Sequence, residues 1–219
     1  MSRRDRLAEE EGPNFWPAVA DAFIGFLAIV LIAGLAAYMD ATANGQEPPP
    51  AKKNFQKEFE KAFVHASGVG VASSERPKVQ DEGFSELNIY FPAKFLFLPC
   101  HIDLMVPAAT ELSDLKSLFK QYDSQIMRVQ ITGHTDTDRP GGECYKKGIR
   151  TNWELSAHRA ITVLELLAPD DGTGLDPHKV WATALGQYHP VQGGADAEAK
   201  TRNRRIEVLI RFREARNNR

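Results

Sequence analysis

An acidic residue, Asp21, stands in an otherwise uncharged and mostly apolar stretch, residues 15–38 (FWPAVADAFIGFLAIVLIAGLAAY). A carboxylate in the hydrocarbon region of a bilayer costs about 2.5–3.5 kcal/mol on insertion scales, so such a group normally faces protein or water. Desolvation favours the protonated form of a carboxyl group, which suits it to taking up and releasing protons. The stretch therefore predicts an ion-carrying acid on a helix. The alternative is a juxtamembrane Asp that reaches for the lipid headgroups.

Small residues share a helical face with this acid, since Ala18, Gly25 and Ala28 lie at i−3, i+4 and i+7 from Asp21. Small side chains let another helix approach closely. A simple membrane anchor needs neither the acid nor this stripe. The pattern favours a helix that packs against a partner over a passive tether.

The apolar stretch is long enough to cross a bilayer, because its residues at 1.5 Å each give roughly 36 Å of helix. A secretory signal would have a shorter apolar run and a small-residue cleavage site. Arg3, Arg4 and Arg6 precede the stretch, whereas the first basic residues after it are Lys52 and Lys53. By the positive-inside rule the N-terminus is cytoplasmic, and the C-terminal portion lies in the periplasm of a Gram-negative cell.

Two cysteines, Cys100 and Cys144, suit that oxidising compartment as one disulfide. The alternative is a zinc site that adds His101 and His134. The four residues match no standard zinc spacing, because neither a CxxC nor an HxxxH pair is present.

The chain after the apolar stretch predicts a linker and one compact domain. Phe55, Phe59 and Phe63 lie at i, i+4 and i+8 among lysines and glutamates, which indicates an amphipathic helix. This helix could lie on the membrane, pack on a partner, plug a pore or lead into the folded domain. The expected parts are a cytoplasmic tail at 1–14, a transmembrane helix at 15–39, a periplasmic linker at 40–83 with the amphipathic helix at 51–66, a compact domain at 84–213 and a tail at 214–219.

The compact domain reads as strands that alternate with helices, which predicts a two-layer α/β sandwich. Strands are expected at 85–97 with an interruption at Pro92, and at 127–132, 180–185 and 205–212; helices are expected from Pro107 and at 152–167. The net charge of −2 with mixed signs excludes a general nucleic-acid footprint. Motifs typical of hydrolases and nucleotide-binding enzymes (GxSxG, HExxH and Walker loops) are absent from the sequence, so we expect no enzyme.

Four ordered motifs resemble the peptidoglycan-binding domain of outer-membrane protein A: ITGHTD at 131–136, NWELSAHRA at 152–160, ALGQYHP at 184–190 and NRRIE at 203–207. The resemblance covers about 130 residues. It departs from the family at Ala184, where glycine is usual, and in a longer loop after Asp136 that contains Cys144. A bridge from Cys144 to Cys100 would tether this insertion beside the site.

The resemblance implies recognition of the diaminopimelate residue of a peptidoglycan stem peptide, which presents an ammonium and a carboxylate on one carbon. It carries over an acid, Asp136, and a base, Arg159, whose guanidinium forks onto the carboxylate. The alternative is that these two merely bridge each other. It also implies lining positions and a second carboxylate contact: Thr135, Asn152, Leu155 and Arg204. No cofactor or metal is implied.

The order of parts resembles the B subunits of stator units that couple ion flow to movement, as in the flagellar motor. Trp16 followed by Ala20 and Asp21 is similar to the opening of their helix. This architecture resembles that of the B subunit of the Zorya anti-phage system. The sequence AFIGFL after Asp21 lacks the threonine and methionines common in flagellar versions, which favours the defence branch over motility. The resemblance implies a dimer of this chain inside a pentamer of a multi-helix A subunit, with Asp21 carrying protons. The alternatives are a motility stator and a passive cell-wall tether.

Overall fold

The computed structural model describes residues 16–43, 48–65 and 76–214, so the expected tails lie almost wholly outside the described residues. The chain forms two compact units, residues 1–47 and 48–219.

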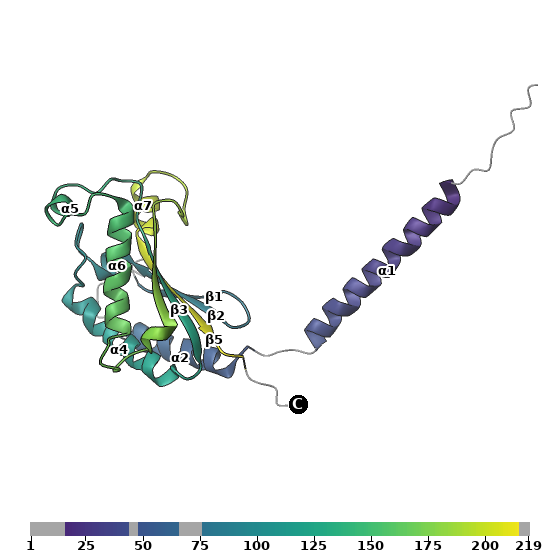
Figure 1. The fold of residues 1–219 in the computed structure, drawn as a ribbon, viewed down its shortest axis with the longest axis horizontal. Helices are drawn as coiled ribbons and strands as arrows, with labels where there is room; N and C mark the ends of the chain where they lie inside the picture. The colour runs from purple at the N-terminus through teal and green to yellow at the C-terminus, as the bar shows by residue number, and fades with distance from the viewer. Residues whose placement is uncertain (1–15, 44–47, 66–75, 215–219) are drawn as a thin grey trace, which may run out of the picture. The chain divides into compact units, whose positions relative to one another are not determined.

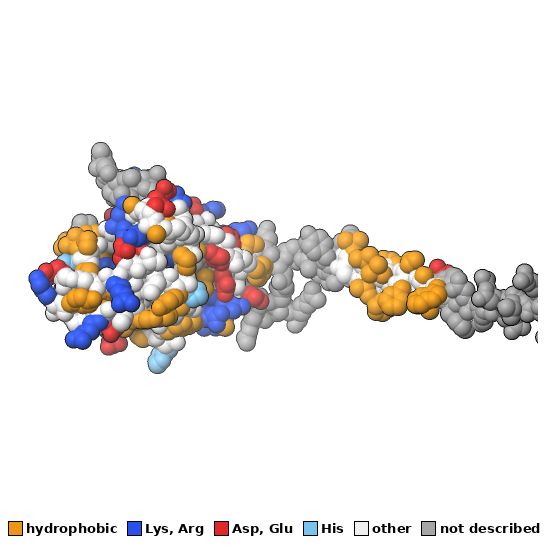
Figure 2. Space-filling view, turned by 90° about the horizontal axis from the view of Figure 1, so that it is seen from above, with side chains coloured by type: hydrophobic (Ala, Val, Ile, Leu, Met, Phe, Trp, Pro, Cys, Tyr) orange, Lys and Arg blue, Asp and Glu red, His pale blue; other side chains and the backbone are white. Residues whose placement is uncertain are grey.

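The first unit contributes one long helix, α1 (Trp16–Ala43). Its segment Val19–Ala36 is long and apolar enough to cross a bilayer. All the described side chains of α1, Asp21 among them, are exposed in the isolated chain, and they present an almost wholly hydrophobic surface (Figure 2). By length and composition α1 therefore agrees with the expected transmembrane helix, and it runs four residues further than the expected end.

The second unit is built on a five-stranded sheet in the order β1-β2-β5-β3-β4. All neighbouring pairs are antiparallel except β3 and β4, which are parallel. The strands are β1 (Lys78–Asp81), β2 (Glu86–Pro92), β3 (Ile126–His134), β4 (Val180–Gly186) and β5 (Arg205–Phe212). The central position of β5 explains its alternation, because buried Ile206, Val208 and Ile210 face the core from every second position.

Three longer helices cover one face of this sheet (Figure 1): α2 (Pro50–His65), α4 (Val106–Tyr122) and α6 (Asn152–Leu167). The expected two-layer α/β sandwich is confirmed. Short elements complete it: α3 (Ala93–Leu96), α5 (Glu143–Lys146), a 3-10 helix (Pro177–Lys179) and α7 (Ala197–Asn203). The expected strand after Pro92 is wrong, because α3 occupies that position, and neither β1 nor α7 was expected.

Helix α2 belongs to the core of the domain. Phe55, Phe59 and Phe63 are buried, and the ring of Phe55 lies 5.6 Å from that of Phe119 on α4 and 5.5 Å from that of Phe212 on β5. The expected boundaries of linker and domain are therefore wrong: the compact unit begins at residue 48, not 84. Of the four roles considered for this helix, leading into the folded domain comes nearest, but the structure goes further, because the helix is itself part of the domain core.

A buried lysine ties α2 to the first strand. Lys52 is only 2% exposed, and its ammonium donates to Asp81 Oδ1 at 2.6 Å and to the carbonyl of Gly83. The hydrogen bond from Lys52 lowers the pKa of Asp81. The charged end of Lys52 thus holds the β1–β2 hairpin against the start of the helix.

We predict that Phe59→Ala lowers the free energy of unfolding of the domain by about 3–5 kcal/mol, because it removes a buried aromatic ring and leaves a cavity. Chemical denaturation of the full chain in detergent, followed by near-ultraviolet circular dichroism, measures this. The control is Lys57→Ala on the exposed face of α2, which should change the value by no more than about 0.5 kcal/mol. Equal stability of the two variants would show that α2 is not part of the core.

Candidate functional site

The site lies where β3 ends against the first turns of α6. At Gly133, near the end of β3, an added Cβ would lie 2.1 Å from the backbone oxygen of Ser156 on α6. Only glycine allows this close approach. The Oγ atom of Ser156 also accepts from the backbone N–H of Gly186 at the end of β4. The two parallel strand ends and the helix are thereby held together, and Thr135 and Asp136 follow directly.

The first turn of α6 is fixed by a capping box. Thr151 Oγ1 accepts from the backbone N–H of Glu154, and the Glu154 carboxylate accepts from that of Thr151, both at 3.1 Å. The next residue, Asn152, donates from Nδ2 to the carbonyls of Asp136 at 3.2 Å and Asp138 at 3.0 Å. Asn152 therefore orients the loop that carries the acid.

Asp136 is buried and pairs with an arginine that lies 68 residues later in the chain. Its Oδ2 lies 2.5 Å from Nη1 of Arg204, and its Oδ1 accepts from the backbone N–H of Asp138 at 3.1 Å. Arg204 is half-exposed and also donates to Thr201 Oγ1. Asp136 is thus in direct contact with two other predicted residues, Asn152 and Arg204.

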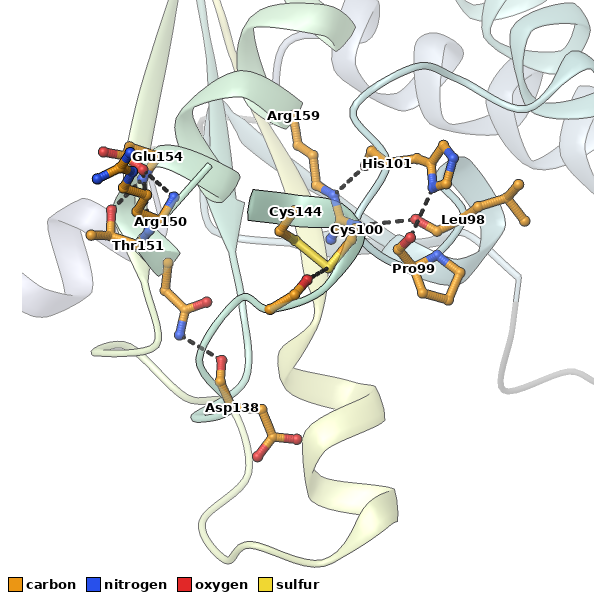
Figure 3. Close-up of a disulfide and its surroundings, with 12 residues drawn as sticks. Leu98, Pro99, Cys100, His101, Asp138, Cys144, Arg150, Thr151, Glu154 and Arg159 are labelled. Atoms are coloured by element: carbon orange, nitrogen blue, oxygen red, sulfur yellow. Dashed lines mark hydrogen bonds between the residues drawn. A yellow bond between two sulfur atoms is a disulfide. The ribbon is translucent and has the colours of Figure 1, made fainter. Parts of the chain in front are cut away.

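Arg159 is 4% exposed and is held by backbone oxygens rather than by an acid. Its Nε donates to the carbonyl of His101 at 3.1 Å and its Nη2 to that of Leu98 at 3.3 Å (Figure 3). Its guanidinium carbon lies 5.0 Å from the centre of the Phe97 ring. Burial lowers the pKa of Arg159 to about 10, and the charge of Arg204 adds to this, whereas Asp136 opposes it.

The alternative in which Asp136 and Arg159 bridge each other does not describe this site, because Asp136 pairs with Arg204 and Arg159 is bound to backbone carbonyls. Two further predicted positions are buried beside them. Thr135 donates its backbone N–H to the carbonyl of Gly186 at 2.9 Å, and Leu155, one turn before Arg159, packs with Cys144 and Ile149.

A disulfide joins Cys100 to Cys144 (Figure 3). The two sulfurs are bonded to each other, so they do not form the zinc site considered as the alternative. The bond links the loop after α3, which supplies the acceptors for Arg159, to the insertion that contains α5.

Several residues at the site were not predicted from the sequence. Leu98 and His101 act through backbone carbonyls, which any residue type carries. Lys200 pairs with Asp138 at 2.7 Å. Trp153 and Tyr188 are exposed and stack with ring centres 5.1 Å apart; both stand inside the motif segments, and their proximity follows from the close approach of β4 to α6.

Fold and site together define a domain of the OmpA-like class, preceded by one apolar helix. Residues 96–204 match the OmpA family. Motility protein B of Bacillus subtilis (strain 168) is 34% identical over 105 residues, a match that covers 48% of this chain and 36% of that relative. The chain thus resembles Motility protein B in a segment that also matches the OmpA family, and it spans about a third of the length of this curated relative.

Solved structures share the fold. The crystal structure of a putative MotB-like protein from Desulfovibrio vulgaris superposes with a TM-score of 0.61 at 28% identity, over 74% of this chain and 95% of that one. The cell wall anchor of the T6SS from Pseudomonas aeruginosa superposes with a TM-score of 0.55 at 22% identity, over 71% of this chain and 96% of that one.

His134, at the end of β3, is buried close to Arg205 and Glu207, its Nε2 lying 3.4 Å from Nη2 of Arg205 and 3.5 Å from Oε1 of Glu207. Burial, and then the charge of Arg205, lowers the pKa of His134 from 6.5 to about 4, against the opposing effect of Glu207. A buried neutral imidazole here fits a structural role for the histidine of the GHTD motif.

We predict that His134 makes the domain less stable as the pH falls from about 6.5 to about 4. In this window the unfolded chain binds a proton at this histidine that the folded chain does not bind. The free energy of unfolding therefore rises with pH and falls on acidification. His134→Gln should reduce this slope by up to one proton. Denaturation at a series of pH values measures it, with His178→Gln as the exposed control; equal slopes for both variants would contradict a neutral His134.

Proposed function

We propose that this protein is the peptidoglycan-anchored B subunit of a proton-driven stator complex in the bacterial inner membrane. Its α/β domain binds the cell wall, and its single membrane helix carries the ion at Asp21. The similarity to Motility protein B supports a motor, and the match of residues 96–204 to the OmpA family supports wall binding.

The observation that carries the wall-binding proposal is the environment of Arg159. A desolvated guanidinium is costly unless an anion or well-placed acceptors compensate it. Among the described residues, two of its three nitrogens donate to carbonyls, and no carboxylate lies within ion-pair distance. A ligand carboxylate would complete its coordination through a charge-assisted hydrogen bond.

Asp136 supplies the opposite charge for a zwitterionic ligand. Its present partner, Arg204, is half-exposed and so can turn outward at little cost. The ammonium of a diaminopimelate residue would take the place of Arg204 against Asp136, while the carboxylate on the same carbon meets Arg159. Arg204 would then be a second donor to that carboxylate. Thr135, Asn152 and Leu155 shape the surroundings.

The membrane helix supplies the energy coupling in this proposal. Moving one elementary charge across 100 mV yields about 2.3 kcal/mol. Protonation of Asp21 removes its charge and changes its attraction to the surrounding A subunits, so each proton transfer can bias one step of rotation. We propose a dimer of this chain inside a pentamer of a multi-helix A subunit, with the N-terminus cytoplasmic and the domain periplasmic. The wall-bound domain prevents the dimer from turning with the ring.

The residues after Asp21 favour the Zorya anti-phage branch of such motors over flagellar motility. A passive tether is the second candidate, and the fold shared with a cell wall anchor favours it. The tether and the motor differ in one testable respect, which is whether Asp21 is required.

We predict that Arg159→Ala weakens binding of the protein to purified sacculi by about 10- to 100-fold, because it removes a charge-assisted hydrogen bond. Co-sedimentation at a series of sacculus concentrations measures this. Arg139→Ala removes an exposed positive charge from the neighbouring loop and should bind as the unchanged protein does. Undiminished sedimentation of Arg159→Ala would remove the wall-binding proposal.

We predict that Asp21→Asn abolishes proton flux and function while the complex still assembles, because the amide cannot take up a proton. Vesicles that contain this chain with the multi-helix protein encoded beside it, loaded with a pH-sensitive dye, measure the flux. Asp40→Asn, outside the Val19–Ala36 span, is the control and should conduct. Full function of Asp21→Asn in cells would leave the tether as the better description.

A further inference from the structure

The acceptors of Arg159 lie in one short loop, residues 97–104, which leaves the core at Phe97 and returns at Leu104, where the two residues form an antiparallel bridge. Inside the loop the backbone N–H of His101 donates to the carbonyl of Leu98 at 3.0 Å. This same carbonyl accepts from Arg159 Nη2. The position of the guanidinium therefore depends on the conformation of the loop.

The loop contains an unfavourable backbone conformation at its centre. Cys100 has a φ of 57°, the one positive φ among the described residues other than glycine. L-amino acids with a Cβ rarely adopt this left-handed conformation. Such a conformation persists when the surrounding structure imposes it. Cys100 is the third residue of the turn Leu98–His101, which the hydrogen bond from His101 to Leu98 closes and in which Pro99 comes second. The covalent bond to Cys144 is a further constraint on the same residue.

Cys144, at the other end of the disulfide, packs against α6, the helix that carries Arg159. Cys144 is fully buried and packs with Ile149 and with Leu155 of α6, and the backbone N–H of Ile149 donates to the carbonyl of Cys144 at 2.9 Å. The disulfide thus connects an insertion packed on α6 to the loop that accepts hydrogen bonds from α6 (Figure 3).

We propose that the Cys100–Cys144 disulfide is a positioning element for Arg159, so that affinity for the ligand carboxylate depends on the redox state of the domain. Reduction breaks the S–S bond with two electrons and two protons and leaves two thiols; a reductant such as dithiothreitol is oxidised to its cyclic disulfide. The loop then keeps only its own turn and the Phe97–Leu104 bridge, and the carbonyls of Leu98 and His101 hold the guanidinium less firmly. This inference rests on the proposed wall-binding function.

The test measures affinity for a soluble stem tripeptide that ends in diaminopimelate, by calorimetry on the full chain in detergent. We expect about tenfold weaker binding after reduction of the otherwise unchanged protein. In Arg159→Lys, which retains a positive charge without the two carbonyl contacts, reduction should change the affinity less than twofold. Non-additivity of this kind is the signature of direct coupling between two sites, and a loss of overall stability would not produce it.

Two double variants, each first checked for folding by near-ultraviolet circular dichroism, separate the covalent bond from the backbone conformation. Cys100→Ser with Cys144→Ser leaves a side chain at the left-handed position and no bond to hold it. Cys100→Gly with Cys144→Ser allows that conformation without strain. We expect affinity to fall in the order oxidised protein, glycine variant, serine variant. The matched control is Lys147→Ala, which removes the exposed ion pair to Asp103 between the same two loops and should bind normally.

A nitrogen NMR spectrum gives a readout independent of binding, because the Nε–H of Arg159 is hydrogen-bonded in the oxidised protein and should exchange faster with water after reduction. Failure of the oxidised protein to bind the tripeptide would overturn the proposed function itself. Normal binding with no effect of reduction would overturn only the positioning role. An equal loss in Arg159→Lys, or glycine-variant binding as strong as that of the oxidised protein, would overturn it as well.

Discussion

The structure of the site depends on keeping a desolvated positive charge in place without an acid of its own. Arg159 is held by two backbone carbonyls and an aromatic ring, while the nearby acid, Asp136, is paired elsewhere. Each surrounding feature serves this arrangement: the close contact at Gly133, the capped start of α6, and the loop joined to the insertion. A guanidinium so largely removed from water is suited to bind a small ligand with a carboxylate that neutralises its charge.

The structure also changes the division of the chain into parts. A stretch with the composition of a linker contains α2 and β1, and the folded unit therefore starts at residue 48, not 84. The ion-carrying and wall-binding roles proposed here lie in separate units of one chain. In that proposal each unit serves its own environment, the bilayer in one case and the periplasm in the other.

Sequence patterns correctly predicted the helices and strands that neighbouring residues determine. The helix Asn152–Leu167 has both its apolar spacing and its capping box within the sequence segment, so its limits were expected correctly. The phenylalanines of α2 predicted a helix, but their partners Phe119 and Phe212 lie far along the chain, so its location could not follow. The motifs named Asp136 and Arg159, whereas the pairing of Asp136 with Arg204 is tertiary and the acceptors of Arg159 are backbone atoms without a residue signature.

The packing of α2 has a mechanical consequence for the proposed link between membrane and cell wall. Tension between the two would enter the domain at Pro50, the first residue of α2, and leave it at the ligand beside Asp136. The sheet resists pulling through ladders of backbone hydrogen bonds on both sides of β5. In the part of the chain that the structure describes, helix α2 is held to the domain through side chains, chiefly three phenylalanines and the buried Lys52. Under tension α2 would therefore detach before the sheet unfolds. The contacts of these few side chains would then set the force that the domain withstands.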